Sequence, residues 1–447
     1  MKTFYIKNDP HQNSEIIDLS KLILENSIEL INEKSLDELV EQIGDAKYVL
    51  LGEASHGTHE YYVLRAQISK LLIEKKGFSF IAVEGDWPDC YRLNRYIKNY
   101  PDSGKTAEEV LHSFNRWPTW MWANWETVAL AEWLREFNER QTKNNKIGFY
   151  GLDVYSLWES FESIIEYLDK KDPKTKQEAI QAFKCFEPYN RGEGQEYARA
   201  SRMVPSLCEN EVVDLLSKIR LKAPSYNTDP EAVMSVEQNA QVIVNAERYY
   251  RAMIKSGADS WNIRDRHMIY TLDNLIKFHG PQAKGIIWEH NTHIGDARAT
   301  DMAAEGMINV GQILNELHRD EGVYSVGFGS YQGTVIAARE WGDVMQIMKV
   351  PEAAKHSWEY ELHRLNAKDR IVFMNQNVKA DIGDKKLGHR AIGVVYHPKY
   401  EYLGNYVPSE MPYRYNAFIY VDETSALHPL HLKSDVRQLP ETYPFGV

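Results

Sequence analysis

Short apolar runs alternate with longer segments of helical periodicity along this 447-residue chain. Turn residues bound the apolar runs, which are four to six residues long. Such alternation is typical of a mostly parallel central sheet flanked by helices, and it predicts an α/β fold. We expect strands at Tyr48–Leu51, Phe78–Val83, Ile147–Leu152, Gly285–Trp288, Val323–Phe328, Ile371–Met374, Ile392–Tyr396 and Ala417–Val421.

The sequence pattern predicts an N-terminal helical segment, residues 1–45, followed by an α/β domain, residues 46–447, in which strands alternate with helices. Between residues 155 and 272 no strand pattern interrupts long, charge-rich helical stretches, so we expect a large helical insertion or subdomain there. A further helix is predicted over Thr58–Lys75, and another is expected to follow Asp86, which is suited to be its N-cap.

The composition is that of an ordinary globular protein, with 43% hydrophobic and 26% charged residues. Its formal charge of -12 argues against nucleic acid and anionic membranes as partners, because Lys and Arg side chains are what bind them. The sequence therefore predicts a small-molecule substrate, with neither a nucleic-acid nor a membrane partner.

Cysteine usage and the N-terminus bear on the cellular compartment. Cys90, Cys185 and Cys208 show no CxxC spacing and leave one cysteine unpaired, so neither a disulfide framework nor a zinc knuckle is indicated. The N-terminus lacks the apolar core of a secretory signal, and no run of about 18 apolar residues occurs. We therefore expect a reducing compartment and a cytoplasmic protein.

Acidic and histidine residues follow four of the predicted strands. In open parallel sheets the substrate crevice lies beyond the carboxyl ends of the strands, so groups that follow different strands meet at one edge. The sequence predicts an active site there. Its expected members are Glu53 and His56 after the first strand, Glu84 after the second, Asp153 after the third, and His290 and His293 after the fourth.

His56 is the candidate general base. It lies between Ser55 and Gly57 on a predicted tight turn from strand to helix. An imidazole in such a turn can accept a proton near neutral pH if a carboxylate orients it, and Glu53 or Glu84 can serve as that partner. The alternative is a histidine that caps the helix or bonds locally.

His290 and His293 are three residues apart and share a face if a helix begins at once. We expect them to polarise a carbonyl or to stabilise an oxyanion. With His56 and a carboxylate they can instead bind a divalent metal such as zinc or manganese, although the spacing is not HExxH. We favour a site without metal or other cofactor, and one of the two can also be an ordinary loop histidine.

Three arginines are candidates for a fixed cation. Arg65 follows His56 by nine residues, while Arg264 and Arg266 precede the fourth strand by a helix length. Each can stabilise a developing negative charge or bind a substrate carboxylate, or it can form a salt bridge that holds its helix. We assign Arg264, together with Asp153, to substrate binding.

Aromatic residues cluster at Trp117, Trp120, Trp122 and Trp125. Trp117, Trp120 and Trp122 are candidates for a cleft wall that stacks on a bulky ligand, and core packing is the alternative. A GxSxG elbow, a Walker motif and a GxGxxG motif are all absent from the sequence. Serine hydrolase, nucleotide hydrolase and dinucleotide-dependent functions are therefore disfavoured.

Taken in order, these motifs resemble the erythromycin esterase family, from about residue 45 to the C-terminus. The motifs are Gly-Glu-x-x-His-Gly at 52–57, Ala82-Val83-Glu84, the 125–138 helix, Gly151-Leu152-Asp153, Arg264-Asp265, Trp288-Glu289-His290-Asn291-x-His293, and Arg390-x-Ile392-Gly393-Val394-Val395-Tyr396. The resemblance implies hydrolysis of a macrolide lactone by water activated on a histidine, without an acyl-enzyme. Homologues are also labelled as succinoglycan biosynthesis proteins.

Carried over by motif, the resemblance implies roles for seven residues. The base is His56, its acidic neighbours are Glu53 and Glu84, His290 and His293 assist, and Arg65 and Arg266 match the basic positions of the family. Our first hypothesis is thus an ester or lactone hydrolase. The alternatives are a metal-dependent hydrolase built on His56, His290 and His293, and a non-catalytic protein that binds a carbohydrate or haem-like ligand.

Overall fold

The structure is a computed structural model that describes residues 21–101, 103–189, 195–201, 207–226, 229–253, 258–382 and 385–431. Residues 1–20 of the predicted N-terminal helical segment and residues 432–447 of the predicted α/β domain thus lie outside the described part of the chain. Within that part, no helix has the length and the apolar content that a membrane span requires.

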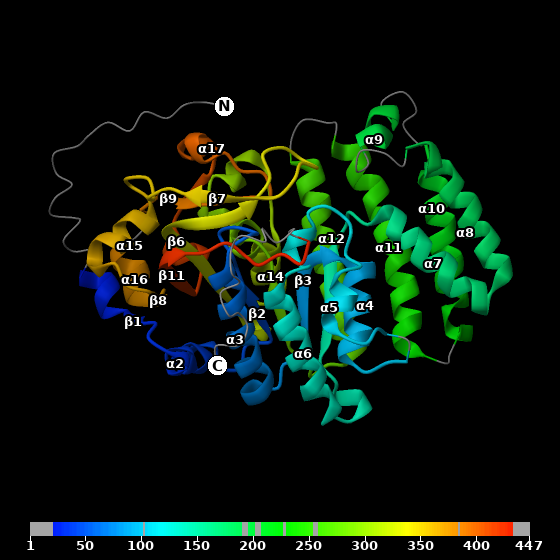
Figure 1. Cartoon of the computed structure of the whole chain (residues 1–447), viewed down its shortest axis with the longest axis horizontal. Coiled ribbons are helices and arrows are strands. Elements are labelled where there is room, and N and C mark those ends of the chain that lie inside the picture. The colour runs from blue at the N-terminus through cyan, green and yellow to red at the C-terminus, as the bar shows by residue number, and fades with distance from the viewer. Residues whose placement is uncertain are drawn as a thin grey trace, which may run out of the picture.

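A nine-stranded sheet forms the centre of the molecule, in the order β1-β8-β11-β6-β2-β5-β3-β4, with β7 paired to β6. Strands β4, β3, β5, β2, β6 and β11 run parallel, while β1, β7 and β8 pair antiparallel with their neighbours. Figure 1 shows helices packed around this sheet, so the predicted mostly parallel α/β fold is confirmed. The strands are β1 (Ser27–Glu29), β2 (Tyr48–Leu51), β3 (Phe80–Asp86), β4 (Gly148–Asp153), β5 (Gly285–Trp288), β6 (Val323–Ala337), β7 (Gln346–Val350), β8 (Arg370–Phe373) and β11 (Ala417–Thr424).

The central strands are buried on both faces, which explains why they read as continuous apolar runs. In β2, Val49 and Leu51 pack into one core, and Tyr48 and Leu50 pack into another on the opposite face. Helices α2 (Glu33–Ile43), α3 (His59–Lys76) and α6 (Trp125–Glu139) contribute to the first core. The second core receives α12 (Asp259–His279), α14 (Val310–Leu317) and α15 (Trp358–Asn366). The remaining helices around the sheet are α4 (Trp87–Ile97), α5 (Ala107–Leu111), α13 (Asn291–Ile294), α16 (Gln376–Ile382), α17 (Glu401–Gly404) and α18 (Met411–Arg414).

The two helices that follow the first strands begin where the sequence predicts. Helix α3 begins after Thr58 and ends at Gly77, whose left-handed backbone terminates it. Helix α4 has Asp86 at its N-cap position and proline in its first turn. Helix α3 thus follows the turn that carries His56, and α4 follows the end of β3, which carries Glu84.

The described part of residues 155–272 consists of helices joined by short connections, without a strand. The helices are α7 (Leu157–Lys171), α8 (Pro173–Phe186), α9 (Gln195–Ser201), α10 (Glu209–Lys222), α11 (Pro230–Met253) and the start of α12. Apart from α12, they bury a hydrophobic cluster of their own and gather at one side of the molecule (Figure 1). Whether this region is a separate subdomain stays a prediction.

A disulfide joins Cys185 of α8 to Cys208, while Cys90 is a buried free cysteine. The expectation of no disulfide is therefore wrong. The two half-cystines lie in separate helical segments that pack together in the folded chain, a proximity that sequence spacing does not reveal. The cytoplasmic location stays a prediction.

Several strand predictions need correction. Residues 392–396 form no strand; Ile392 makes an isolated bridge with Ser55, and Val395 makes one with Ala338. Strand β3 continues through Glu84, and β6 continues to Ala337. The N-terminal segment is helical at 21–25 but then forms the edge strand β1 before α2.

Sequence reasoning also missed β7 and a separate hairpin of β9 (Leu387–Arg390) and β10 (Tyr406–Ser409). These strands are short and partly exposed, so they lack the apolar runs that revealed the central strands.

We predict that the denatured, unreduced protein reacts with a thiol-specific dye at one cysteine per chain, and at three after reduction. Cross-linking across 23 residues restricts the unfolded chain, so reduction should lower the free energy of unfolding by about 3 kcal/mol. Urea denaturation with and without reductant measures this loss. Three reactive thiols before reduction would contradict the pairing.

Candidate active site

A cavity of about 470 Å³ opens where the parallel strands end. We call it the strand-end cavity. Most of the polar residues expected at this edge line it, although they come from distant parts of the chain. These residues are His56, Glu84, Asp153, Arg264, His290 and His293.

The turn that carries His56 is held by backbone hydrogen bonds from several segments. The amide of Ile392 donates to the Ala54 carbonyl at 2.8 Å, and the amides of Ile336 and Leu427 donate to the Gly57 carbonyl at 3.0 Å each. A Cβ at Gly57 would lie 2.0 Å from the Ile336 carbonyl oxygen, so only glycine fits this close approach. These contacts fix the backbone of the turn from which the His56 side chain projects.

Glu53 and Arg65 hold His56 from the side that faces away from the strand-end cavity. The Nδ1 atom of His56 lies 2.9 Å from Oε1 of Glu53, and Nη2 of Arg65 donates to Oε2 of Glu53 at 2.8 Å. Arg65 is fully buried against the rings of Tyr62 and Trp288. Neither Glu53 nor Arg65 lines the cavity, so both lie behind His56 as seen from the cavity.

The Nε2 atom of His56 faces the carboxylate of Glu84 across 3.9 Å, longer than a hydrogen bond. Burial alone would lower the pKa of His56, but the charge of Glu84 and the hydrogen bond that His56 donates to Glu53 outweigh it, so the pKa is raised. An imidazole held in this way by a carboxylate at Nδ1 leaves Nε2 to accept a proton.

Arg264 joins the ends of β3 and β4. Its Nε and Nη2 donate to the two carboxylate oxygens of Asp153 at 2.9 and 2.6 Å, and Nη2 also donates to Glu84 at 2.6 Å. Burial opposes ionisation of Glu84, but the charge of Arg264 and the hydrogen bond from the His290 amide hold its pKa well below the usual range. The carboxylates of Glu84 and Asp153 thus share one guanidinium.

His293 has both ring nitrogens in hydrogen bonds. Nη1 of Arg264 lies 2.9 Å from Nε2, and Oδ1 of Asp265 lies 2.9 Å from Nδ1. Since a guanidinium can only donate, Nε2 is the acceptor and Nδ1 carries the proton. The ring stacks on Trp261, with centroids 4.5 Å apart. His293 therefore orients Arg264.

His290 lies beside His56, with ring centroids 4.9 Å apart. Its Nδ1 accepts from the backbone amide of Thr292 at 3.3 Å, which places the ring proton on Nε2. Within the described chain that buried Nε2 has no hydrogen-bond partner. Burial and the charge of His56 hold the pKa of His290 well below its usual value, so the ring is neutral.

Besides Glu53 and Arg65, two further predicted site residues do not line the cavity. Arg266 is exposed and does not line the cavity, because two helical positions place it on the side of α12 away from Arg264. Trp120 is buried in the core and does not line the cavity either, whereas Trp117 and Trp122 do. Trp122 also donates from Nε1 to the Glu84 carbonyl at 3.1 Å.

Sequence reasoning missed several groups in the cavity wall. Trp261, Tyr155 and Trp341 come from outside the tryptophan cluster, and Asp89 lies in the first turn of α4. Burial and the neighbouring charge of Asp86 raise the pKa of Asp89 to about 7. The spacing of Asp86 and Asp89 on one helix face was the available signal for this acidic part of the wall.

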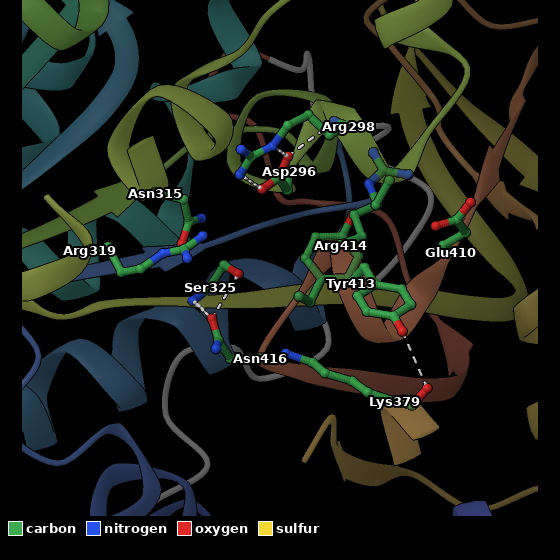
Figure 2. Close-up of a pocket in the computed structure, with 12 residues that line it drawn as sticks. Asp296, Arg298, Asn315, Arg319, Ser325, Lys379, Glu410, Tyr413, Arg414 and Asn416 are labelled. Carbon is green, nitrogen blue, oxygen red and sulfur yellow. Dashed lines mark hydrogen bonds and ion pairs between the residues drawn. The ribbon is translucent and has the colours of Figure 1, made fainter. Parts of the chain in front are cut away.

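A second cavity, of about 390 Å³, lies behind the turn that carries His290 and contains none of the predicted site residues. Figure 2 shows its lining, in which Arg298 is paired with Asp296. Arg414 also lines it and donates from Nη2 to the Asn291 carbonyl at 3.1 Å. The side chain of Arg414 thereby supports the turn between His290 and His293.

The family model described as erythromycin esterase matches residues 73–424, about four fifths of the chain. The chain belongs to the erythromycin esterase family. Membership of this family supports the assignment of the protein as a hydrolase. The matched region includes Glu84, Arg264, His290 and His293, but it begins after the turn that carries His56.

Two curated relatives agree with this membership at low identity. Erythromycin esterase type II of Escherichia coli is 24% identical over 315 residues, which cover 66% of this chain and 71% of the relative. The putative hydrolase YbfO of Bacillus subtilis is 20% identical over 335 residues, covering 71% of this chain and 72% of the relative.

Solved structures share the fold. A succinoglycan biosynthesis protein superposes with a TM-score of 0.74 at 20% identity, over 93% of this chain and 99% of the other. A protein from Bacillus cereus gives 0.76 at 18%, with the same coverage. An erythromycin esterase mutant in its open conformation gives 0.67 at 14%, over 90% of this chain and 96% of the other.

We predict that Arg264→Gln lowers the free energy of unfolding by about 3–5 kcal/mol, because it leaves the buried carboxylates of Glu84 and Asp153 without their shared cation. Arg266→Gln is the matched control on the same helix and should change stability by less than about 0.5 kcal/mol. Urea denaturation at pH 7.5 measures both. Equal effects of the two substitutions would contradict the assignment of Arg264 as the buried partner.

Proposed function

We propose that this protein hydrolyses esters or lactones by direct attack of a water molecule that His56 activates. The observation that carries the proposal is the chain of contacts from Arg65 through Glu53 to Nδ1 of His56, which leaves Nε2 facing the strand-end cavity. Family membership supports hydrolysis as the reaction class.

In the proposed reaction, Nε2 of His56 takes a proton from water as the oxygen attacks the carbonyl carbon of the substrate. A tetrahedral intermediate forms, its ester C–O bond breaks, and the imidazolium returns the proton to the departing alkoxide. The products are a carboxylic acid and an alcohol. The charge of Glu53 and Glu84 stabilises the imidazolium that forms between the two proton transfers.

Two groups can stabilise the negative charge on the substrate oxygen. The Nε2–H of His290 has no partner within the described chain, and it lies beside the base. Arg264 supplies a fixed guanidinium that its carboxylate partners hold in place. Donors positioned before the reaction lower the barrier because they need no reorganisation as charge develops.

The hydrogen bonds of His293 argue against the metal-dependent alternative. With Nε2 accepting from Arg264 and Nδ1 directed at Asp265, His293 offers no lone pair to an ion shared with His56 and His290. We propose accordingly that the residues of the strand-end cavity act without a metal.

The cavity wall indicates a bulky substrate. Trp117, Trp122, Trp261, Trp341 and Tyr155 provide aromatic surface, and carboxylates lie beside it. Such a wall suits a large apolar ring or sugar-bearing ester, and macrolide lactones are one class with that chemistry.

We predict that His56→Ala lowers kcat/KM for an aryl ester or lactone by roughly 10²–10⁴-fold, the usual contribution of a general base. His112→Ala is the matched control, because His112 is exposed and lies outside the cavity. Circular dichroism checks that both variants fold. An unchanged rate in His56→Ala, on any substrate that the wild type hydrolyses, would refute the mechanism.

The pH profile gives an independent test, because His56 must be neutral to accept a proton. Since the charges of Glu84 and Glu53 raise its pKa, kcat/KM should rise with pH through a midpoint above 6.5. Glu53→Gln removes one of these charges, so the midpoint should move to lower pH. A midpoint that is unaffected by Glu53→Gln would contradict the pairing.

A further inference from the structure

A second group of metal-binding side chains lies outside the strand-end cavity. His59 is the first residue of α3, Glu126 is the second residue of α6, and His428 belongs to the segment that follows β11. One potential ligand atom from each lies within 4.8 Å of the other two. No sequence motif links the three, so the fold alone creates the group.

The geometry is convergent. The Nδ1 atoms of His59 and His428 lie 2.6 and 2.7 Å from the same oxygen, Oε1 of Glu126. The two imidazole rings are 5.1 Å apart and nearly perpendicular, so they approach that oxygen from different directions. Two nitrogens and a carboxylate oxygen thus point to one small region.

The backbone holds these segments together independently of the three side chains. The amide of His59 donates to the Ser425 carbonyl at 2.9 Å, the amide of Trp125 donates to the His428 carbonyl at 3.0 Å, and the amide of Leu430 donates to the Ala123 carbonyl at 2.8 Å. The ligand-bearing residues are therefore placed before any ion binds, which reduces the entropy cost of binding.

We propose that His59, Glu126 and His428 bind a divalent first-row transition metal, with zinc as the best match. Two imidazole nitrogens and one carboxylate oxygen are a common ligand set for zinc, and water completes the tetrahedron. Ligand atoms of a tetrahedral zinc ion lie ~3.4 Å apart, so the nitrogens need to draw back by less than about 1 Å. Deprotonated Nδ1 atoms replace the two hydrogen bonds to Glu126.

Burial and charge are compatible with an ion at this position. Glu126 is buried, and the side chain of His428 is 45% exposed, so an ion can enter from that side. Two helix N-termini nearby disfavour a cation, and the carboxylates of Glu126 and Glu60 oppose that effect. The bound ion would link α3, α6 and the segment after β11 three residues from the general base.

The test is a titration of metal-stripped full-length protein with ZnCl₂ at pH 7.5, followed by calorimetry, with Co²⁺ as a spectroscopic substitute. We expect one zinc site in the wild type that Glu126→Gln weakens more than about tenfold, since the amide keeps the shape but loses the charge. Zinc should raise the Tm of the wild type and not that of this variant.

Glu136→Gln is the matched control, because Glu136 is exposed on the same helix and lies outside the group. His428→Gln is the second variant in case Glu126→Gln folds poorly, and circular dichroism checks both. Any zinc bound by the strand-end histidines survives in all three variants, so it does not mimic the expected loss. No binding, or equal affinity in the wild type and in both ligand variants, would overturn the proposal.

Discussion

The guanidinium of Arg264 contacts a side chain from β3, one from β4 and one from α13, the short helix that follows β5. It pairs with Asp153 and Glu84 and reaches the imidazole of His293. Two carboxylates buried this close together would repel each other without a cation between them. The same pairing keeps Glu84 ionised opposite His56, which raises the pKa of that histidine. The electrostatics of the cavity therefore depend on one buried side chain.

The central strands and the convergence of their polar ends follow from sequence patterns. Continuous apolar runs revealed β2, β4 and β5, and the rule that parallel strands share a carboxyl edge brought His56, Glu84 and His290 together. The choice between neighbouring residues was harder. Arg264 and Arg266 look alike in sequence, and only the helical phase of α12 decides which of them faces the cavity.

Other features depend on contacts that have no local signature. The tryptophan cluster divides between cavity and core because Trp120 turns inward while Trp117 and Trp122 do not. The disulfide joins segments whose proximity results from helix packing. Ile392 has the apolar context of a strand, yet its amide bonds to the Ala54 carbonyl as an isolated bridge. In each case tertiary packing overrides the local pattern.

The close contact between Gly57 and Ile336 bears on the mobility of the site. Ile336 belongs to β6, a long strand whose first half runs through the middle of the sheet. Because the turn rests directly on this backbone, the main chain that carries His56 cannot shift without displacing β6. We therefore expect any change in the shape of the cavity to come from the surrounding walls rather than from this turn.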